Sequence, residues 1–320
     1  MRAFITGAAG MMGSHLLDFL AEKNVESMGI DIKSEEEFPD KNLKAHFVQC
    51  DVRDMEKLTR LMIEFKPDVI FHLAAQPHPI IAWEKPQYTA DVNIIGSINV
   101  FEIVKKHLPH ALIVSACTSA EYGYVDPSEV PVKESKPLRP INLYGVTKVA
   151  QELLAYQYWY NFKVRSISLR IFNTTGPRKI NDALSDWTRQ VAKIEKGLQE
   201  PVIRVGNLTT RRAITDVRDL IEACWLAATK GEVGGVYNVS GAHVYLMEDA
   251  LNILKKISRV PFTVFQDPKL MRPSDEPIIY GDSSKFKKQT GWSQNISLEK
   301  TLTDMVDYWR ARDDDGKSYI

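Results

Sequence analysis

The sequence has no excess charge of either sign and no long hydrophobic run. Its 41 lysine and arginine residues balance its 41 aspartate and glutamate residues, so the formal net charge is zero. A nucleic-acid partner would favour a strongly basic chain, and we expect none. A membrane-spanning helix needs about 20 consecutive apolar residues. Because the sequence contains no such stretch, we expect no membrane partner either.

Cysteine is scarce in this chain of 320 residues. Cys50, Cys117 and Cys224 are odd in number and far apart, which predicts neither a disulfide framework nor a metal cluster. The N-terminus runs directly into an apolar segment, without the pattern of a signal peptide. The hydrophobic content of 44% and the aromatic content of 9% are typical of a folded chain. We therefore expect a reduced, cytoplasmic, globular protein without a metal site.

What the sequence does contain is a regular alternation of apolar and helical segments through its first third. Apolar runs that are typical of buried strands occur at 2–6, 25–30, 46–50, 69–73 and 111–115. Helical patterns, such as those at 55–65 and 88–107, separate them. This order predicts an α/β fold with a doubly wound parallel sheet that helices cover on both faces.

Beyond about residue 170 the pattern becomes less regular, and glycine and proline separate shorter elements. We expect residues 1–172 to form a first domain, onto which 212–240 packs back. Residues 173–211 and 241–312 are expected to form a smaller α/β domain, and 313–320 a solvated tail. Because no flexible linker separates the two regions, we expect them to pack together.

Three glycines at three-residue spacing lie between the first strand and the first helix. Gly7 permits a tight turn, Gly10 lets the backbone approach a pyrophosphate, and Gly13 lets the helix lie close to the sheet. The helix N-terminus that follows, at Met11 and Met12, offers unpaired N–H groups and a positive dipole end to phosphates. This pattern, directly after a strand, predicts a dinucleotide-binding turn.

Two aspartates end the next two predicted strands. Asp31 can accept hydrogen bonds from both hydroxyls of an adenosine ribose, and it would repel a 2′-phosphate. We therefore expect NAD as the cofactor in preference to NADP, although Lys33 nearby softens that preference. Asp51 ends the third strand, where it suits the adenine amino group.

A tyrosine and a lysine four residues apart stand at the start of a predicted helical stretch, 149–160. Of the 12 tyrosines, only Tyr144 has a lysine, Lys148, four residues later. That spacing brings both side chains to one face of a helix. An ammonium there would lower the pKa of the tyrosine and hold a cofactor ribose, so the phenol could exchange a proton near neutral pH.

Together these motifs resemble the extended short-chain dehydrogenase/reductase family, whose members act on nucleotide-diphosphate sugars with NAD(P). The later motifs are most similar to the branch of the GDP-mannose 4,6-dehydratases and the GDP-4-keto-6-deoxymannose reductases. The resemblance covers nearly the whole chain and rests on Thr6–Gly13, Asp51-Val52, His72–Gln76, Thr118-Ser119, Tyr122-Gly123, Tyr144–Lys148, Arg170–Asn173, Gly206–Leu208, Arg212, Thr215–Asp219, Arg272–Ser274 and Gly291-Trp292.

The resemblance implies a Rossmann-type sheet, a homodimer and a nucleotide-diphosphate sugar, preferably a GDP-sugar, as substrate. It implies that Thr118, Tyr144 and Lys148 form the catalytic set. The cofactor would contact Gly7, Gly10, Met11, Met12, Gly13, Asp31, Asp51, Val52, Leu73, Ala74, Ala75, Gln76, Tyr144 and Lys148. The substrate would contact His78, Ser119, Glu121, Asn173, Arg212 and Arg272.

One position discriminates between the reactions of this family. Three residues before Gly123, the 4,6-dehydratases carry a glutamate that removes the C5 proton, whereas this chain has Ala120. An alanine accepts no proton, so a 4-keto reductase is favoured, most of all a GDP-4-keto-6-deoxymannose reductase. A C4 epimerase and a 4,6-dehydratase remain alternatives. A regulatory module that binds NAD without catalysis is the alternative outside the enzymes.

Overall fold

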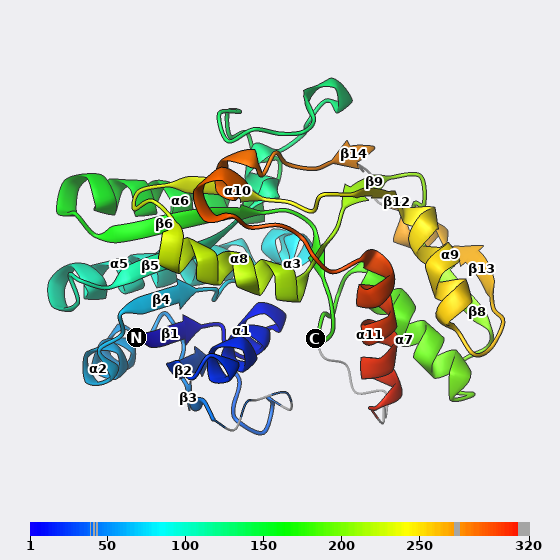
Figure 1. Cartoon of the computed structure of the whole chain (residues 1–320), viewed down its shortest axis with the longest axis horizontal. Coiled ribbons are helices and arrows are strands. Elements are labelled where there is room, and N and C mark those ends of the chain that lie inside the picture. Colours follow the sequence, from blue (N-terminus) through cyan, green and yellow to red (C-terminus); the bar gives the residue numbers. More distant parts are fainter. Residues whose placement is uncertain (39, 41, 43, 272–275, 313–320) are drawn as a thin grey trace.

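A seven-stranded sheet forms the centre of the larger part of the molecule (Figure 1). The structure is a computed structural model, and it describes residues 1–38, 40, 42, 44–271 and 276–312. The strands are parallel throughout, in the order β11-β6-β5-β4-β1-β2-β3. Their bounds are β1 Arg2–Thr6, β2 Glu26–Asp31, β3 His46–Gln49, β4 Val69–His72, β5 Leu112–Thr118, β6 Arg165–Ile171 and β11 Val236–Val239. The predicted doubly wound Rossmann-type fold is thereby confirmed.

Both faces of the sheet are buried, which is why its strands read as continuous apolar runs. In β1, Ala3 and Ile5 face one core while Phe4 faces the other, and all three are fully buried. The first core is covered by α1 (Met11–Glu22), α8 (Val217–Lys230) and α10 (Ser284–Thr290). The second is covered by α2 (Met55–Phe65), α5 (Gly96–His107) and α6 (Leu143–Phe162).

The segment 217–239 returns to the sheet, because α8 packs on it and β11 extends its edge next to β6. Phe286 and Trp292, from the region around α10, join the same core. The predicted bounds of the two domains stay a prediction.

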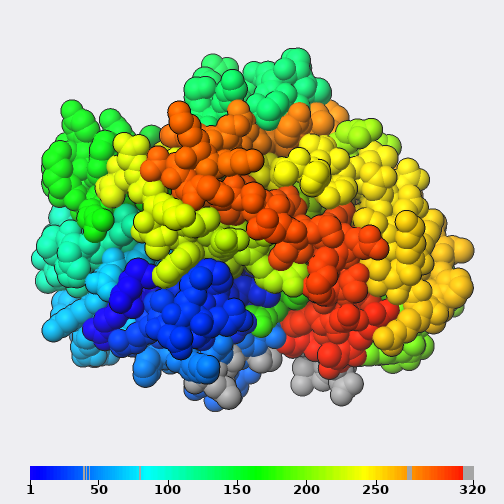
Figure 2. All heavy atoms as spheres, in the orientation of Figure 1, coloured from blue at the N-terminus to red at the C-terminus, as the bar shows by residue number. Residues whose placement is uncertain are grey.

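A smaller third core lies beyond the carboxyl ends of the strands, to the right in Figure 1. It is built by α7 (Ala183–Glu195), α9 (Met247–Ile257) and α11 (Leu298–Arg310) with the parallel pair of β8 (Val202–Val205) and β13 (Thr263–Gln266). In Figure 2 the red α11 lies against the yellow-green α8. Arg218 on α8 forms an ion pair with Asp304 on α11 at 2.7 Å. The two parts therefore share an ion-paired boundary.

Small strand pairs connect these cores. β7 (Thr174–Thr175) pairs with β10 (Thr215–Asp216), and β9 (Arg211–Ala213) lies between β12 (Val244–Leu246) and β14 (Ile278–Ile279). Short turns complete the chain: α3 (Pro79–Glu84), α4 (Pro86–Ala90), η2 (Ser119–Tyr122), η3 (Pro127–Glu129) and η4 (Pro268–Leu270). Among the described helices, none is long and apolar enough to cross a membrane.

Two helices differ from their predicted extent. The predicted helix 88–107 is interrupted by a π-helical turn, η1 (Asp91–Ile95). Asn93 in this turn sends its side chain to the backbone of Gln76 and to Thr147 on α6, which matches the occurrence of π-turns near functional sites. The helix predicted from 149 begins at Leu143, because the Asn142 side chain caps it by accepting a hydrogen bond from Gly145 N.

Candidate functional site

The predicted site residues gather at the carboxyl ends of the parallel strands. The strand order reverses between β1 and β4, and open α/β sheets bind ligands at such a switch point. Gly7 follows β1, Asp31 ends β2, Leu73 follows β4 and Thr118 ends β5. The fold thus brings together residues that are far apart in the sequence.

The glycine turn has the geometry that its spacing predicts. Gly7 has φ +75°, and a Cβ there would lie 2.8 Å from Ala74 N. A Cβ on Gly13 would lie 2.3 Å from Gly7 O, so the helix can approach the turn only without a side chain. By contrast, a Cβ on Gly10 would meet its nearest protein atom at 3.4 Å. The packing of the protein therefore leaves space next to the Gly10 backbone, and a ligand can approach the backbone there.

The N-terminus of α1 is free to receive an anion. Gly10 is the capping residue, no side chain caps the helix, and its first turn contains no acidic residue. Unpaired N–H groups and the positive dipole end therefore face the turn. The residues present at this turn fit the pyrophosphate of a dinucleotide.

Asp31 is held by backbone N–H groups on both carboxylate oxygens. Ala9 N donates to Oδ2 at 2.9 Å, and Lys33 N donates to Oδ1 at 3.1 Å. Burial raises the pKa of this carboxyl group, and the backbone hydrogen bonds oppose that rise. Each oxygen retains acceptor capacity for a ribose hydroxyl.

Asp51 is engaged within its own loop. Arg53 binds both of its carboxylate oxygens, with Nη2 at 2.6 Å from Oδ2, and this lowers the pKa of Asp51. Val52 is buried and packs against Gly96, where a Cβ would lie 2.7 Å from Val52 Cγ2. An adenine contact for Asp51 and Val52 stays a prediction.

The loop after β4 is tied to β1 and to η1. Leu73 N and Ala74 N donate to Thr6 Oγ1, while the Thr6 hydroxyl also contacts His72 Nδ1 at 2.9 Å. His72 is fully buried and contacts Ser97 through its other ring nitrogen. It is a core residue.

The remainder of this loop turns inward. The Gln76 side chain donates to Thr89 Oγ1 and His78 O and accepts from His78 N, so it shapes the loop. Burial lowers the pKa of the half-buried His78. Cofactor contacts of Ala75 and Gln76 and a sugar contact of His78 stay predictions.

The three predicted catalytic side chains lie together at the end of β5 and the start of α6. The Thr118 side chain lies close enough to Tyr144 to lower the pKa of its phenol. Lys148 is 2% exposed, and its Nζ donates to Ala116 O and to Gln151 Oε1, each at 2.8 Å. An ammonium has three donors, so one remains for a cofactor ribose.

Burial decides the pKa values of this pair. It raises the pKa of Tyr144, an effect that Thr118 opposes, and it lowers the pKa of Lys148. The prediction that Lys148 lowers the pKa of Tyr144 is wrong for this structure. The lysine is turned to Ala116 and Gln151, and desolvation of the phenolate dominates.

Glu121 is completely buried, and a substrate contact of Glu121 stays a prediction. Residues 119–122 form a 3-10 turn in which Glu121 Oε1 accepts from Thr118 N at 2.8 Å, while Thr118 Oγ1 accepts from Ala120 N. The carboxyl group faces the interior because it closes this capping box. Ser119 and Ala120 are half-buried, and a substrate contact of Ser119 stays a prediction.

Beyond β6, one predicted substrate residue has a free donor. Asn173 Nδ2 is buried without a hydrogen-bond partner among the described residues, and so is Thr215 Oγ1 on the neighbouring chain segment. Asn173 O accepts from Thr215 N at 2.9 Å. Buried polar groups are normally satisfied, so this free amide is consistent with a ligand contact.

The predicted arginine pair is described only in part. Arg212 lies on β9, and its Nη1 donates to Arg211 O and Glu276 O. Arg272 lies outside the described residues, so the clamp that it would form with Arg212 stays a prediction.

Several residues that support the site have no role in the sequence interpretation. Asn93 joins the loop after β4 to α6, and Gln151 orients Lys148. Glu152 on α6 and Arg170 on β6 form a buried ion pair. A helical spacing of three and four residues after Lys148 is the signal for Gln151 and Glu152, whereas the pairing with Arg170 depends on tertiary structure.

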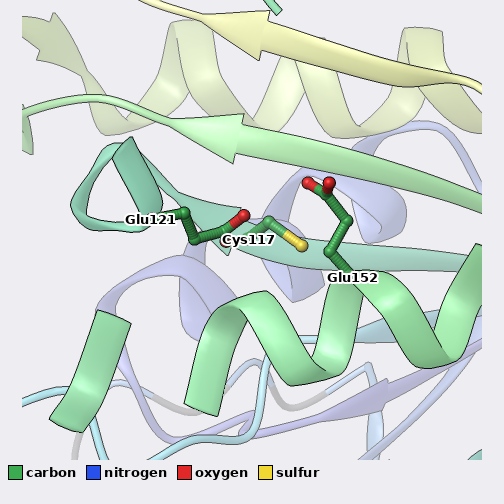
Figure 3. Close-up of side chains that lie close together, drawn as sticks. All are labelled: Cys117, Glu121 and Glu152. Atoms are coloured by element: carbon green, nitrogen blue, oxygen red, sulfur yellow. The ribbon is translucent and has the colours of Figure 1, made fainter. Parts of the chain in front are cut away.

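Cys117, Glu121 and Glu152 form the described group closest to a metal-ligand set (Figure 3). Their ligand atoms lie within 4.8 Å of one another. However, Arg170 Nε and Nη2 already bind both oxygens of Glu152. A guanidinium therefore occupies the cationic position of this group. The three cysteines are free and buried.

Comparisons with known proteins extend this picture. The family model described as GDP-mannose 4,6 dehydratase matches residues 4–305. GDP-6-deoxy-D-mannose reductase from Pseudomonas aeruginosa is 27% identical over 312 residues, covering 97% of this chain and 98% of the relative.

Two solved structures share the fold over 97% of this chain and 99% of theirs. RMD from Pseudomonas aeruginosa complexed with NADPH has a TM-score of 0.84 and 26% identity. UDP-glucose 4-epimerase from Thermotoga maritima, with UDP-glucose, has a TM-score of 0.86 and 27% identity. These matches confirm the resemblance that the motifs indicated. With a family match over nearly its whole length, the chain belongs to the GDP-mannose 4,6 dehydratase family.

Proposed function

We propose that this protein is an NAD-dependent nucleotide-sugar oxidoreductase that transfers hydride at C4 of the sugar. The observation that carries the proposal is the placement of Thr118 at the end of β5 and of Tyr144 and Lys148 at the start of α6, beside the glycine turn, with Thr118 close enough to lower the pKa of the Tyr144 phenol. The nicotinamide supplies the hydride chemistry when bound. The chain's own residues position the sugar and move the proton.

The favoured direction is reduction of a 4-keto-6-deoxy sugar, with GDP-4-keto-6-deoxymannose as the first candidate. Ala120 stands where elimination of water would need a base, and the neighbouring Glu121 is buried. A reductase must protonate the C4 oxygen, and burial raises the pKa of Tyr144, which keeps its phenol protonated. The similar Pseudomonas aeruginosa protein is named as a GDP-6-deoxy-D-mannose reductase, which supports this direction.

Three side chains have separate roles at the reacting carbon. Tyr144 donates its proton to the C4 oxygen, and the Thr118 hydroxyl hydrogen-bonds the same oxygen. Lys148 uses its remaining N–H for the nicotinamide ribose, since its other two donors bind Ala116 O and Gln151. This arrangement holds the reactants in one geometry, from which most of the catalytic advantage would come.

For the cofactor we propose NAD in preference to NADP. Asp31 carries a negative charge where a 2′-phosphate would lie, and two backbone N–H groups fix its orientation. RMD from Pseudomonas aeruginosa is a structure with NADPH, so a direct comparison of the two cofactors belongs in the first assay.

The sugar nucleotide would lie between the sheet and the third core. The free Nδ2 of Asn173 supports a contact with the sugar or diphosphate. Arg212 and Arg272 would bind phosphate oxygens, for which the planar guanidinium is suited. In this proposal 1–172 and 212–240 form the NAD domain, and 173–211 with 241–312 form the nucleotide-sugar domain.

We propose a homodimer formed through α6. Four apolar or aromatic side chains on this helix are exposed although they recur at helical spacing: Val146, Leu153, Tyr156 and Tyr160. A stripe of this kind favours burial against another helix. The free, buried cysteines fit a reducing compartment, and we propose the cytoplasm.

A C4 epimerase is the second candidate, because UDP-glucose 4-epimerase from Thermotoga maritima shares the fold. The deciding experiment incubates the purified protein with NADH or NADPH and GDP-4-keto-6-deoxymannose, and separately with GDP- and UDP-hexoses. A reductase consumes NADH, which the absorbance measures. It yields a deoxy sugar with a C4 hydroxyl, which NMR identifies. Interconversion of two hexoses without net NADH loss would instead favour the epimerase, and inertness with every sugar would contradict the substrate class.

A further inference from the structure

A group of charged side chains is buried directly behind Thr118. Glu121 is 0% exposed, and Glu152 and Arg170 are each 5% exposed. They come from η2, α6 and β6 respectively. Figure 3 shows the carboxyl groups of Glu121 and Glu152 on either side of the Cys117 sulfur. Glu121 belongs to the turn η2, which Thr118 caps.

Of the two glutamates, only Glu152 accepts hydrogen bonds from Arg170. Its Nε donates to Glu152 Oε2 at 2.7 Å and its Nη2 donates to Glu152 Oε1 at 2.6 Å. Its Nη1 donates to Tyr122 Oη and to Glu134 O. Every guanidinium nitrogen is therefore engaged, and Glu152 is neutralised by a bidentate pair.

Glu121 has no matching partner for its second oxygen. Its Oε1 accepts from Thr118 N at 2.8 Å. Its Oε2 lies 3.7 Å from Arg170 Nε and has no hydrogen-bond partner among the described residues. A buried carboxylate with one unsatisfied oxygen is costly, and a proton on that oxygen would remove the charge and supply a donor for Glu152.

Electrostatics favour that proton. Burial, followed by repulsion from Glu152, raises the pKa of Glu121 to about 8. With both carboxyl groups ionised, Glu121, Glu152 and Arg170 together carry one net negative charge. The group becomes neutral when the two carboxyl groups share one proton. The titratable and charged groups that surround Glu121 from the neighbouring elements are Cys117, Tyr122, Tyr144, Lys148, Glu152 and Arg170.

We propose that Glu121 is a positioning residue: one oxygen fixes the Thr118 backbone, while a proton shared with Glu152 keeps the carboxyl group neutral behind the reacting side chains. Its effect on turnover rests on the function proposed above. An anionic Glu121 raises the pKa of Tyr144 further and so makes it a weaker acid. Loss of the shared proton therefore slows protonation of the sugar oxygen at alkaline pH.

The kinetic test compares Glu121→Gln and Glu121→Leu with the control Glu134→Gln. The glutamine keeps the acceptor for Thr118 N and donates to Glu152 without titrating. We expect it to retain kcat within about threefold at pH 7 and to lose the decline of wild-type kcat above pH 8. The leucine cannot hold Thr118, so kcat falls at least about tenfold while the Kd for NADH stays unchanged.

The control tests whether any carboxyl group in this region would act alike. Glu134 Oε1 accepts from Asn238 N, and among the described residues Glu134 makes no hydrogen bond with Thr118, so Glu134→Gln should keep the wild-type pH profile. If Glu121→Gln shows the wild-type alkaline decline, or a folded Glu121→Leu retains full kcat, the proposal is wrong.

An infrared measurement tests the shared proton without any sugar substrate. The carbonyl band of a protonated carboxylic acid should be present in the NADH complex at pH 7 and lost by about pH 10. It should be missing in Glu121→Gln and unchanged in Glu134→Gln. A wild-type protein without the band, or a band that survives in Glu121→Gln, overturns the proposal. The infrared result does not depend on which sugar the enzyme uses. It therefore distinguishes failure of the shared-proton proposal from failure of the proposed function.

Discussion

Ala9 N donates a hydrogen bond to Asp31 Oδ2 at 2.9 Å, so the turn after β1 holds the carboxylate that ends β2. The two features that are predicted to bind the cofactor therefore form one unit in the structure. Lys33 N holds the other oxygen at 3.1 Å. The carboxylate is oriented before a ribose arrives, which reduces the entropy that binding must overcome.

Asp31→Ala should weaken NADH binding by about tenfold or more, because hydrogen bonds to a charged group contribute about 1.5–3 kcal/mol. NADPH binding should change less, since the same change removes repulsion of the 2′-phosphate. Fluorescence titration with both cofactors measures the ratio. Glu26→Ala, at the exposed start of β2, is the control. An equal loss for both cofactors would show that Asp31 does not discriminate between them.

Gly13→Ala and Gly10→Ala form a matched pair. A Cβ on Gly13 would lie 2.3 Å from Gly7 O, so this variant should lose about 1–3 kcal/mol of unfolding free energy. A Cβ on Gly10 has 3.4 Å to its nearest protein atom, so stability should stay near wild type while NADH affinity falls. Denaturant unfolding and NADH titration separate the effects. A Gly10 variant with unchanged NADH affinity would place the pyrophosphate elsewhere.

Tyr144→Phe should lower kcat by about 10²- to 10⁴-fold, the usual contribution of a positioned proton donor. NADH binding should persist, because the ring remains and Lys148 still contacts Ala116 O and Gln151. Steady-state kinetics with the 4-keto sugar measure the loss, and Tyr160→Phe, on the exposed face of α6, serves as the control. Near-normal turnover of Tyr144→Phe would exclude its role in proton transfer.

Leu153→Glu should convert the proposed dimer to a monomer, because the side chain is 56% exposed in the apolar stripe of α6. A charge buried against a partner helix would be strongly unfavourable. Light scattering coupled to size-exclusion chromatography reads the mass directly. Leu198→Glu changes a leucine that is 61% exposed but lies after α7, and it should leave the mass unchanged. A monomeric wild-type protein would contradict the proposed dimer.

Glu121→Gln should change how stability depends on pH. The folded protein raises the pKa of Glu121 from 4.5 to about 8, so it binds a proton that the unfolded chain has already released. The stability that this group contributes is therefore complete below pH 4.5 and is lost as pH rises through 8. The difference in unfolding free energy between wild type and Glu121→Gln should fall across this window in denaturant titrations. A constant difference would mean that Glu121 does not titrate there.

Local sequence patterns predicted the sheet because they record burial directly. Ala3, Phe4 and Ile5 are all buried since both faces of β1 are covered, and this yields an uninterrupted apolar run. Glycine spacing predicted the turn equally well, because Gly7 has φ +75° and a Cβ on Gly13 would meet Gly7 O of the same turn. The carboxyl ends of parallel strands then bring Asp31 and Thr118 to one edge of the sheet.

The environment of each catalytic group was decided by tertiary structure alone. The four-residue spacing of Tyr144 and Lys148 suggested a lysine that acidifies the phenol, but desolvation raises the pKa of Tyr144 instead. Glu121 looked available to substrate, yet it closes a turn and faces Glu152 and Arg170. These residues lie far apart in the chain and interact only through packing. The sequence by itself therefore determined the sheet, the turn and the residue types of the site, whereas the charges that surround them depend on burial, which only the folded chain creates.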